Sequence, residues 1–178
     1  MSAPSPHLLA HREAVVAAAR LGPVLDLACG RGRHALAAAA WGAPVVAMDR
    51  SRDALADLRG QSRARGLPVL PVRTDLETPL GIPVRAGSCG VILVFRFLFR
   101  PLAEAIVDAL APGGLLLYET FTIHQRDLGQ GPSNPAFLLH TGELPQLFAR
   151  LRLVSHWEGV EPRPPPQALA RLAARKRG

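Results

Sequence analysis

Hydrophobic and polar positions alternate in blocks along the chain, and the blocks predict short strands separated by helices. Apolar runs of strand length occupy residues 24–27, 45–48, 69–72, 91–95 and 115–121. Segments rich in helix-forming residues lie between or before them, at 6–20, 33–41, 52–65 and 101–110. This alternation is typical of an α/β protein built around a parallel sheet.

The segment 24–40, VLDLACGRGRHALAAAA, joins a strand to a helix through a glycine turn. Gly30 and Gly32 allow the backbone to approach a ligand closely, because no side chain stands in the way. The helix that follows directs its unpaired N–H groups and the positive end of its dipole into the space above the turn. We therefore predict that a nucleotide binds there.

Carboxylates occur at the ends of three predicted strands: Asp26, Asp49 and Asp75. Asp49 follows Gly30 by nineteen positions, close to the ~20 expected between a glycine turn and an acid that binds a ribose. Ligands of open α/β sheets bind at the carboxyl ends of the strands, so the three acids predict one site.

The identity of the nucleotide depends on Asp26. Gly30, Gly32 and Ala35 satisfy the pattern of a dinucleotide site, which keeps an NAD-dependent oxidoreductase as an alternative. However, a carboxylate beside the turn would repel a pyrophosphate and attract an ammonium group. S-adenosylmethionine carries an ammonium group, a ribose for Asp49 and an adenine amine for Asp75, and we prefer it as the cofactor.

Length and composition favour one domain, residues 1–178, with a single core. No apolar run approaches the roughly 20 residues that cross a bilayer, and the first residues lack a signal-peptide pattern. We expect a cytoplasmic protein without membrane contact. Cys29 and Cys89 form no CxxC pair, so we expect reduced thiols and no metal site.

The net charge of +7 is compatible with a nucleic-acid partner, but the arginines are spread along the chain. The basic tail, 174–178, is expected to fray. The long segment 122–140 predicts a lid loop, and we expect the apolar residues at its end, 137–139, to pack it against the domain. A helix at 141–150 and a strand at 151–157 are expected next, whereas 167–176 fits either a helix or an edge strand.

The residues Asp26-Leu-Ala-Cys-Gly-Arg-Gly32 resemble the first motif of class I S-adenosylmethionine-dependent methyltransferases. Asp49, Asp75 and the Pro-Gly-Gly at 112–114 fall where that family has its later motifs. Within the family, FRFLFRPL at 95–102, YETF at 118–121 and GPSNPAFLLHTGEL at 131–144 are similar to small bacterial enzymes of the tellurite-resistance type.

This resemblance implies a Rossmann-like, doubly wound, seven-stranded sheet with the last strand antiparallel, so that 167–176 is a strand. S-adenosylmethionine would be the cofactor and S-adenosylhomocysteine the product. The expected cofactor-binding residues are Asp26, Ala28, Cys29, Gly30, Gly32, Asp49, Arg50, Asp75, Leu76 and Phe95.

Three departures from the family pattern matter. Ala28 stands where glycine is common, so we expect an ordinary φ there. Gly90 replaces an acid common before the fourth strand, and Phe97 and Phe99 replace residues that are often Tyr and His.

Methyl transfer from a sulfonium is an in-line displacement, and a general base is needed only when the acceptor carries a proton at neutral pH. The candidate bases are Glu119, His124 and His140, and Arg96, Arg100 and Phe137 are the candidate acceptor-binding residues. We predict a methyltransferase with a small-molecule acceptor. An RNA methyltransferase and a non-catalytic cofactor-binding module are alternatives, and the sequence leaves the acceptor and the oligomeric state open.

Overall fold

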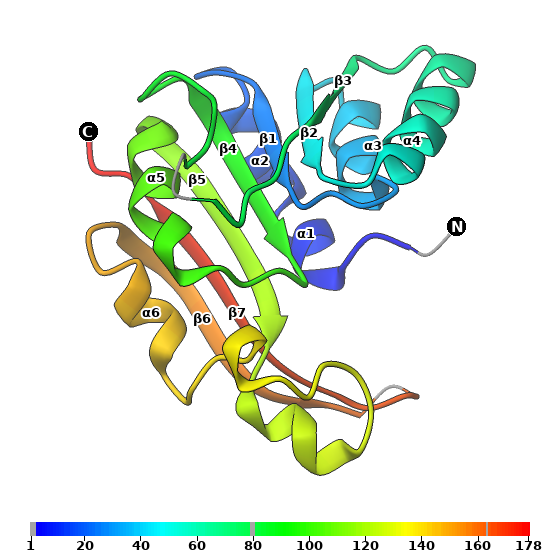
Figure 1. The fold of residues 1–178 in the computed structure, drawn as a ribbon. Helices are drawn as coiled ribbons and strands as arrows, with labels where there is room; N and C mark the ends of the chain where they lie inside the picture. Colours follow the sequence, from blue (N-terminus) through cyan, green and yellow to red (C-terminus); the bar gives the residue numbers. More distant parts are fainter. Residues whose placement is uncertain (1–2, 79–80, 163) are drawn as a thin grey trace.

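A seven-stranded sheet forms the centre of the molecule in a computed structural model that describes residues 3–78, 81–162 and 164–178 (Figure 1). The strand order is β3-β2-β1-β4-β5-β7-β6. The strands are β1 (Val24–Leu27), β2 (Val45–Asp49), β3 (Val69–Arg73), β4 (Cys89–Phe95), β5 (Leu110–Phe121), β6 (Arg152–Glu161) and β7 (Gln167–Arg175). The first five strands pair in parallel, and β7 pairs antiparallel with both β5 and β6. The fold and the strand at the C-terminus are therefore as predicted.

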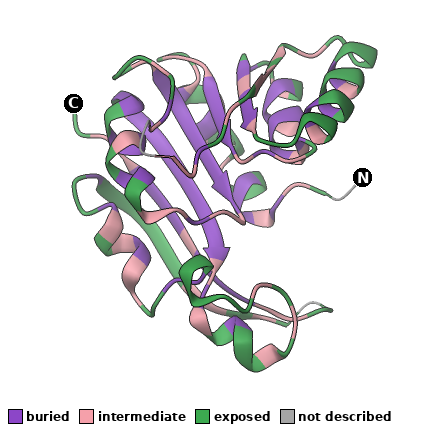
Figure 2. Cartoon of the chain, viewed as in Figure 1, coloured by how far each residue is buried: buried purple, intermediate pink, exposed green. Residues whose placement is uncertain are grey.

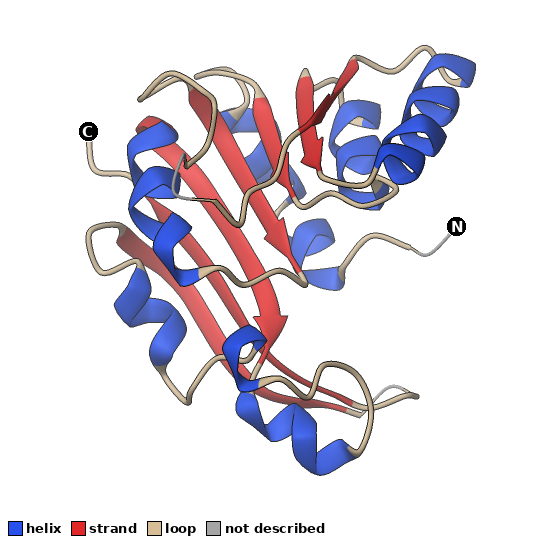
Figure 3. Cartoon of the chain, in the orientation of Figure 1, coloured by secondary structure: helices blue, strands red, loops and turns tan. Residues whose placement is uncertain are grey.

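Helices cover both faces of this sheet (Figure 3). They are α1 (Pro6–Ala10), α2 (Arg12–Ala18), α3 (Arg33–Ala40), α4 (Arg52–Ala64), α5 (Ala103–Ala109) and α6 (Glu143–Leu147), with short 3-10 helices η1 (Arg100–Leu102), η2 (Ile123–Leu128) and η3 (Pro135–Phe137). Alternate residues of β4 serve the two cores: Ile92 packs with α5 and α6, and Leu93 packs with the helices α1 to α4. Burial on both faces explains why the central strands are continuous apolar runs.

Exposure increases from the centre of the sheet toward its two edge strands, β3 and especially β6 (Figure 2). Every residue of β1 and β4 is buried. The edge strand β6 is mostly exposed, which is why its sequence mixes polar and apolar residues. The carboxyl ends of β1, β2 and β4 are thus held in a rigid, dry framework. The candidate functional site lies along the edge that these carboxyl ends form.

The N-terminal helix predicted at 6–20 is divided in two at His11, whose φ of −106° ends α1. The sequence alone predicts that His7, four residues before His11, is a surface histidine. In the structure His7 is only 7% exposed, and its Nε2 donates to the carbonyl of Leu172 at 3.1 Å. The prediction was wrong because the segment packs onto β5 and β7, a long-range contact that helical spacing does not reveal.

The C-terminal residues are better ordered than predicted. Ala174 and Arg175 belong to β7, and the N–H of Lys176 donates to the carbonyl of Gly114 at 3.0 Å. The Lys176 ammonium donates to the carbonyl of Leu110 at 2.8 Å. The expectation of fraying was wrong because the tail continues the antiparallel pairing with β5.

The segment 122–140, which the sequence predicts to be a lid loop, is fastened at both ends. Residues 122 and 139 form a β-bridge, and Leu138 and Leu139 are fully buried, whereas Phe137 is 45% exposed. The helix that follows begins at Glu143 after the N-cap Gly142 and ends at Leu147, short of residue 150. The loop is therefore packed at its C-terminal end, as predicted, but Phe137 takes no part in that packing.

Gly90, the second residue of β4, provides a test of how closely this strand packs against Ala18 and Gly22. A Cβ on Gly90 would lie 2.2 Å from the carbonyl oxygen of Ala18 and 2.5 Å from that of Gly22. We expect Gly90→Ala to lower the free energy of unfolding by about 1–3 kcal/mol, because backbone atoms must move. Gly60→Ala in α4 is the control: a Cβ there meets nothing within 4 Å, so stability should rise by about 0.5–1 kcal/mol. Urea unfolding measures both, and equal stability of Gly90→Ala and the native chain would contradict this packing.

Candidate functional site

A pocket of about 190 Å³ lies at the carboxyl ends of β1, β2 and β3, and we call it the acid pocket. Its lining residues are Ala28, Asp49, Arg50, Thr74, Asp75, Leu76, Glu77 and Phe97. At the end of β2, Asp49 accepts from the backbone N–H of Gly30 at 2.7 Å and from that of Ser51 at 2.8 Å. Asp49 thereby fixes the glycine turn while its remaining lone pairs stay available to a ligand.

The second acid of the pocket follows β3. Asp75 accepts from the N–H of Glu77 at 2.9 Å, and Glu77 forms an ion pair with Arg50 at 2.7 Å. Leu76 is buried, and Phe97 adds an aromatic wall. Two carboxylates beside apolar walls suit a nucleoside, whose ribose hydroxyls and adenine amine are donors and whose base is flat and apolar. The residues present therefore fit the adenosine part of S-adenosylmethionine.

The turn before α3 adopts left-handed backbone angles. Ala28 has a φ of 52°, so our expectation of an ordinary φ was wrong, and a non-glycine residue there costs of order 1–3 kcal/mol. Gly32 has a φ of 75°, and a Cβ on it would lie 2.3 Å from Leu58. Gly30 has a φ of 54° and open space where its Cβ would be. The turn is thus pressed against α4 on one side and open toward a ligand at Gly30.

Asp26 lies beneath the turn rather than in the acid pocket. It is 1% exposed and accepts from the N–H of Ala35 at 2.9 Å. Burial raises the pKa of Asp26 to about 7, against the lowering effect of that hydrogen bond. Burial also raises the pKa of the Cys29 thiol well above its usual range, so Cys29 is a packing residue and not a nucleophile.

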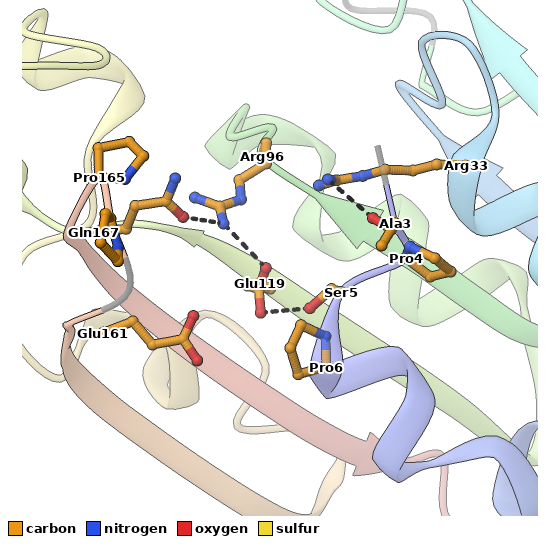
Figure 4. Close-up of a pocket in the computed structure, with 11 residues that line it drawn as sticks. Ala3, Pro4, Ser5, Pro6, Arg33, Arg96, Glu119, Glu161, Pro165 and Gln167 are labelled. Carbon is orange, nitrogen blue, oxygen red and sulfur yellow. Dashed lines mark hydrogen bonds and ion pairs between the residues drawn. The ribbon is translucent and has the colours of Figure 1, made fainter. Parts of the chain in front are cut away.

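A second pocket, of about 220 Å³, opens where β4, β5 and β7 meet the N-terminal segment, and we call it the arginine pocket (Figure 4). Its lining residues are Ala3, Pro4, Ser5, Pro6, Arg33, Arg96, Glu119, Glu161, Pro164, Pro165 and Gln167. Arg96 follows β4 with a φ of 62°. Its guanidinium lies 4.5 Å from the centre of the Phe121 ring and donates to Gln167 at 2.6 Å.

Glu119 connects the walls of the arginine pocket. Its Oε2 accepts from the Ser5 hydroxyl at 2.8 Å and from Arg171 at 2.7 Å, and its Oε1 lies 3.5 Å from Arg96. The Ser5 N–H donates to Nε2 of His34 at 3.2 Å. These contacts hold the N-terminal segment over the ends of the strands. Burial lowers the pKa of His34 to about 3, so this imidazole stays neutral and accepts from Ser5.

Four other predicted residues lie elsewhere. Arg100 and Phe137 line a third pocket, of about 360 Å³, where Arg100 donates to Glu143 at 2.5 and 2.8 Å. His124 lines a fourth pocket, and the N–H of exposed His140 donates to Glu143 at 2.7 Å. Of the predicted catalytic and acceptor-binding residues, the structure brings Arg96 and Glu119 together in the arginine pocket and Arg100 and Phe137 together in the third pocket.

Sequence reasoning missed several lining residues of the two pockets: Ser5, Arg33, Thr74, Glu77, Phe97, Glu161 and Gln167. A signal existed for Arg33, which stands inside the glycine motif at the start of α3. No sequence signal pointed to Glu161 and Gln167, because only the β6–β7 hairpin places them against β5.

A protein-family model described as a methyltransferase domain matches residues 24–114, just over half of the chain. The chain belongs to this family. The match confirms the predicted enzyme class and its cofactor, S-adenosylmethionine, in place of the NAD of the oxidoreductase alternative.

Solved structures share the fold of this methyltransferase. TehB from Haemophilus influenzae aligns with a TM-score of 0.74 and 20% identity over 93% of this chain and 62% of that chain. Two S-adenosylmethionine-dependent methyltransferases align similarly. The enzyme from Methanosarcina mazei has a TM-score of 0.70 and 17% identity over 87% of this chain and 92% of that chain. The enzyme from Mesorhizobium loti has a TM-score of 0.70 and 19% identity over 95% of this chain and 100% of that chain. No curated protein matches the sequence significantly. Within the described part of the methyltransferase, no helix is long and apolar enough to span a membrane.

The pKa of Asp26 predicts how cofactor affinity depends on pH. Below pH 7 the side chain is protonated, and above it the carboxylate attracts the positively charged cofactor. We expect the Kd for S-adenosylmethionine to fall about fivefold between pH 5.5 and 7.5, which corresponds to about 1 kcal/mol of coupling.

Calorimetry of the methyltransferase and of Asp26→Asn tests this coupling. The variant should lose the pH dependence, whereas Asp53→Asn, which changes an exposed acid of α4, should retain it. The same slope in Asp26→Asn and the native chain would show that another group is responsible.

Proposed function

We propose that the chain transfers the methyl group of S-adenosylmethionine directly to a small-molecule acceptor held in the arginine pocket. The observation that carries this proposal is the position of two consecutive residues after β4. Phe97 lines the acid pocket, and its neighbour Arg96 lines the arginine pocket. One backbone segment thus lines both pockets, which suits a reaction between a nucleoside cofactor and a second molecule.

The protein's contribution to such a reaction is alignment and the exclusion of water. When bound, S-adenosylmethionine supplies a methyl group on a positively charged sulfur, which is already an activated electrophile. Asp49 and Asp75 would bind the ribose and the adenine, and the N-terminal segment fastened by Ser5 would cover the reacting atoms. Such orientation can contribute ~7–11 kcal/mol to lowering a barrier.

The size of the arginine pocket supports a small acceptor. Its volume of about 220 Å³ lies below the roughly 300–1,000 Å³ of pockets that enclose drug-sized ligands. The segment 3–6 closes one side of the pocket, which would hinder a large substrate such as RNA. These two features favour a small molecule over the RNA alternative.

Asp49→Asn tests the cofactor site. Loss of a charged hydrogen-bond acceptor costs about 1.5–3 kcal/mol, so the Kd for S-adenosylhomocysteine should rise about 10- to 150-fold. Asp127→Asn, which changes an exposed acid of η2, is the matched control and should bind normally. Titration calorimetry, with thermal unfolding to confirm that each variant is folded, measures the effect. Failure of the folded native chain to bind either form of the cofactor at millimolar concentration would contradict the proposed function.

A further inference from the structure

The carboxylates of the arginine pocket are already engaged by arginine side chains. Glu119 is 1% exposed and is bound by Ser5, Arg171 and Arg96. Glu161 forms an ion pair with Arg171 at 2.8 Å. A general base needs a lone pair directed at the acceptor's proton. Glu119 has none to spare without giving up an arginine or Ser5, and Oε1 of Glu161 is held by Arg171.

The nearby imidazoles are engaged as well. Nε2 of His34 accepts from the Ser5 N–H, and Nε2 of His7 donates to the carbonyl of Leu172. Burial lowers the pKa of His7 to about 4, so this imidazole stays neutral near neutral pH and is a weak base. No histidine is among the described residues that line the pocket, and positions 1–2, 79–80 and 163 contain neither a carboxylate nor an imidazole. An acceptor that reaches the pocket with its reactive lone pair already exposed needs none of these engaged groups as a base.

Positive charge in the same pocket is less fully compensated than negative charge. Arg33 and Arg96 both line it, and Arg33 contacts only the carbonyl of Ala3, at 3.4 Å, among the interactions in the described residues. Nη1 of Arg96 is buried and has no hydrogen-bond acceptor in the described part of the chain. Burial lowers the pKa of Arg96 against the raising effect of the negative charges of Glu119 and Glu161, and the positive charges of Arg33 and Arg171 lower it further. An anion in the pocket would relieve this repulsion and provide the missing acceptor.

We propose that the acceptor is a small thiol, which the arginine pocket binds and presents as its thiolate. This inference rests on the proposed function and specifies its acceptor. A thiol beside arginine loses its proton to solvent at a lower pH, and a thiolate is intrinsically very nucleophilic. A carboxylate would also arrive as an anion, but a guanidinium binds both of its oxygens and so occupies the lone pairs that would have to attack.

The step needs no further reactant. A lone pair of the thiolate sulfur forms a bond to the methyl carbon, and the bond between that carbon and the cofactor's sulfur breaks. The electron pair of the broken bond stays on the cofactor's sulfur, which gives neutral S-adenosylhomocysteine and a methyl thioether. The thiol proton has left for solvent before the attack.

Four acceptors that share one scaffold test the assignment: phenylmethanethiol, phenylmethanol, phenylmethanamine and phenylacetate. With radiolabelled S-adenosylmethionine and the full chain, we expect methylation of the thiol at least 100-fold faster than of the other three. We also expect kcat for the thiol to rise with pH to a plateau, as the bound thiol ionises.

Variants of the two arginines distinguish charge from structure. Arg96→Gln and Arg33→Gln should each lower kcat/KM for the thiol about tenfold or more and move the rise of kcat to higher pH. Arg96→Lys, which keeps the charge, should restore part of the activity. Arg85→Gln, which changes an exposed arginine between β3 and β4, is the matched control. Binding of S-adenosylhomocysteine by each variant shows whether it is folded.

The outcomes separate this proposal from the proposed function. A folded chain that binds no cofactor overturns the proposed function itself. A chain that binds cofactor but methylates the alcohol, the amine or the carboxylate preferentially, or none of the four, overturns only the thiolate. If the pH profile is unchanged in both Gln variants, Arg33 and Arg96 are not the groups that stabilise the thiolate.

Discussion

The buried carboxylate of Glu119 is the interaction on which the arrangement of this site depends. It binds Ser5 from the N-terminal segment, Arg171 from β7 and Arg96 from the loop after β4. A charge with 1% exposure is costly to bury unless it is paired and hydrogen-bonded. Since each partner comes from a different part of the chain, the pairing is complete only when those parts are docked. The pairing thereby couples the docking of the N-terminal segment over the site to the folding of the sheet.

The same carboxylate explains the division of the site into two pockets. Glu119 belongs to the arginine pocket, where its arginine partners concentrate, whereas Asp49 and Asp75 belong to the acid pocket. Complementary ligands follow from the charges: a cationic nucleoside for the acids, and a small anionic partner for the arginines. Phe97 and Arg96, adjacent in the chain, mark where the two ligands would meet.

Local patterns were enough to predict strands β1 to β6, the glycine turn, and the positions of Asp49 and Asp75 at the carboxyl ends of β2 and β3, because each depends on residues near it in sequence. The strand at β7 needed the family resemblance, because its residues fit a helix equally well. Features that depend on distant contacts were mispredicted or missed. His7 is buried because α1 packs on β7, the tail is ordered because Gly113 and Gly114 pair with Lys176, and Gln167 joins the site only through the β6–β7 hairpin.

Ala28 illustrates a different limit. Sequence reasoning assumed that alanine would avoid a positive φ, yet the turn imposes 52°. The hydrogen bonds that surround the turn, from Gly30 to Asp49 and from Ala35 to Asp26, over-determine its shape and compensate for the cost of that angle. A strained residue beside a ligand pocket is consistent with a turn shaped for binding.

The most direct test of the two-pocket account is a crystal structure with S-adenosylhomocysteine bound. The account predicts that the ribose contacts Asp49, that the adenine lies against Leu76 and Phe97, and that the sulfur faces the arginine pocket beside Arg96. Adenine in the arginine pocket, or a sulfur directed away from Arg96, would contradict it.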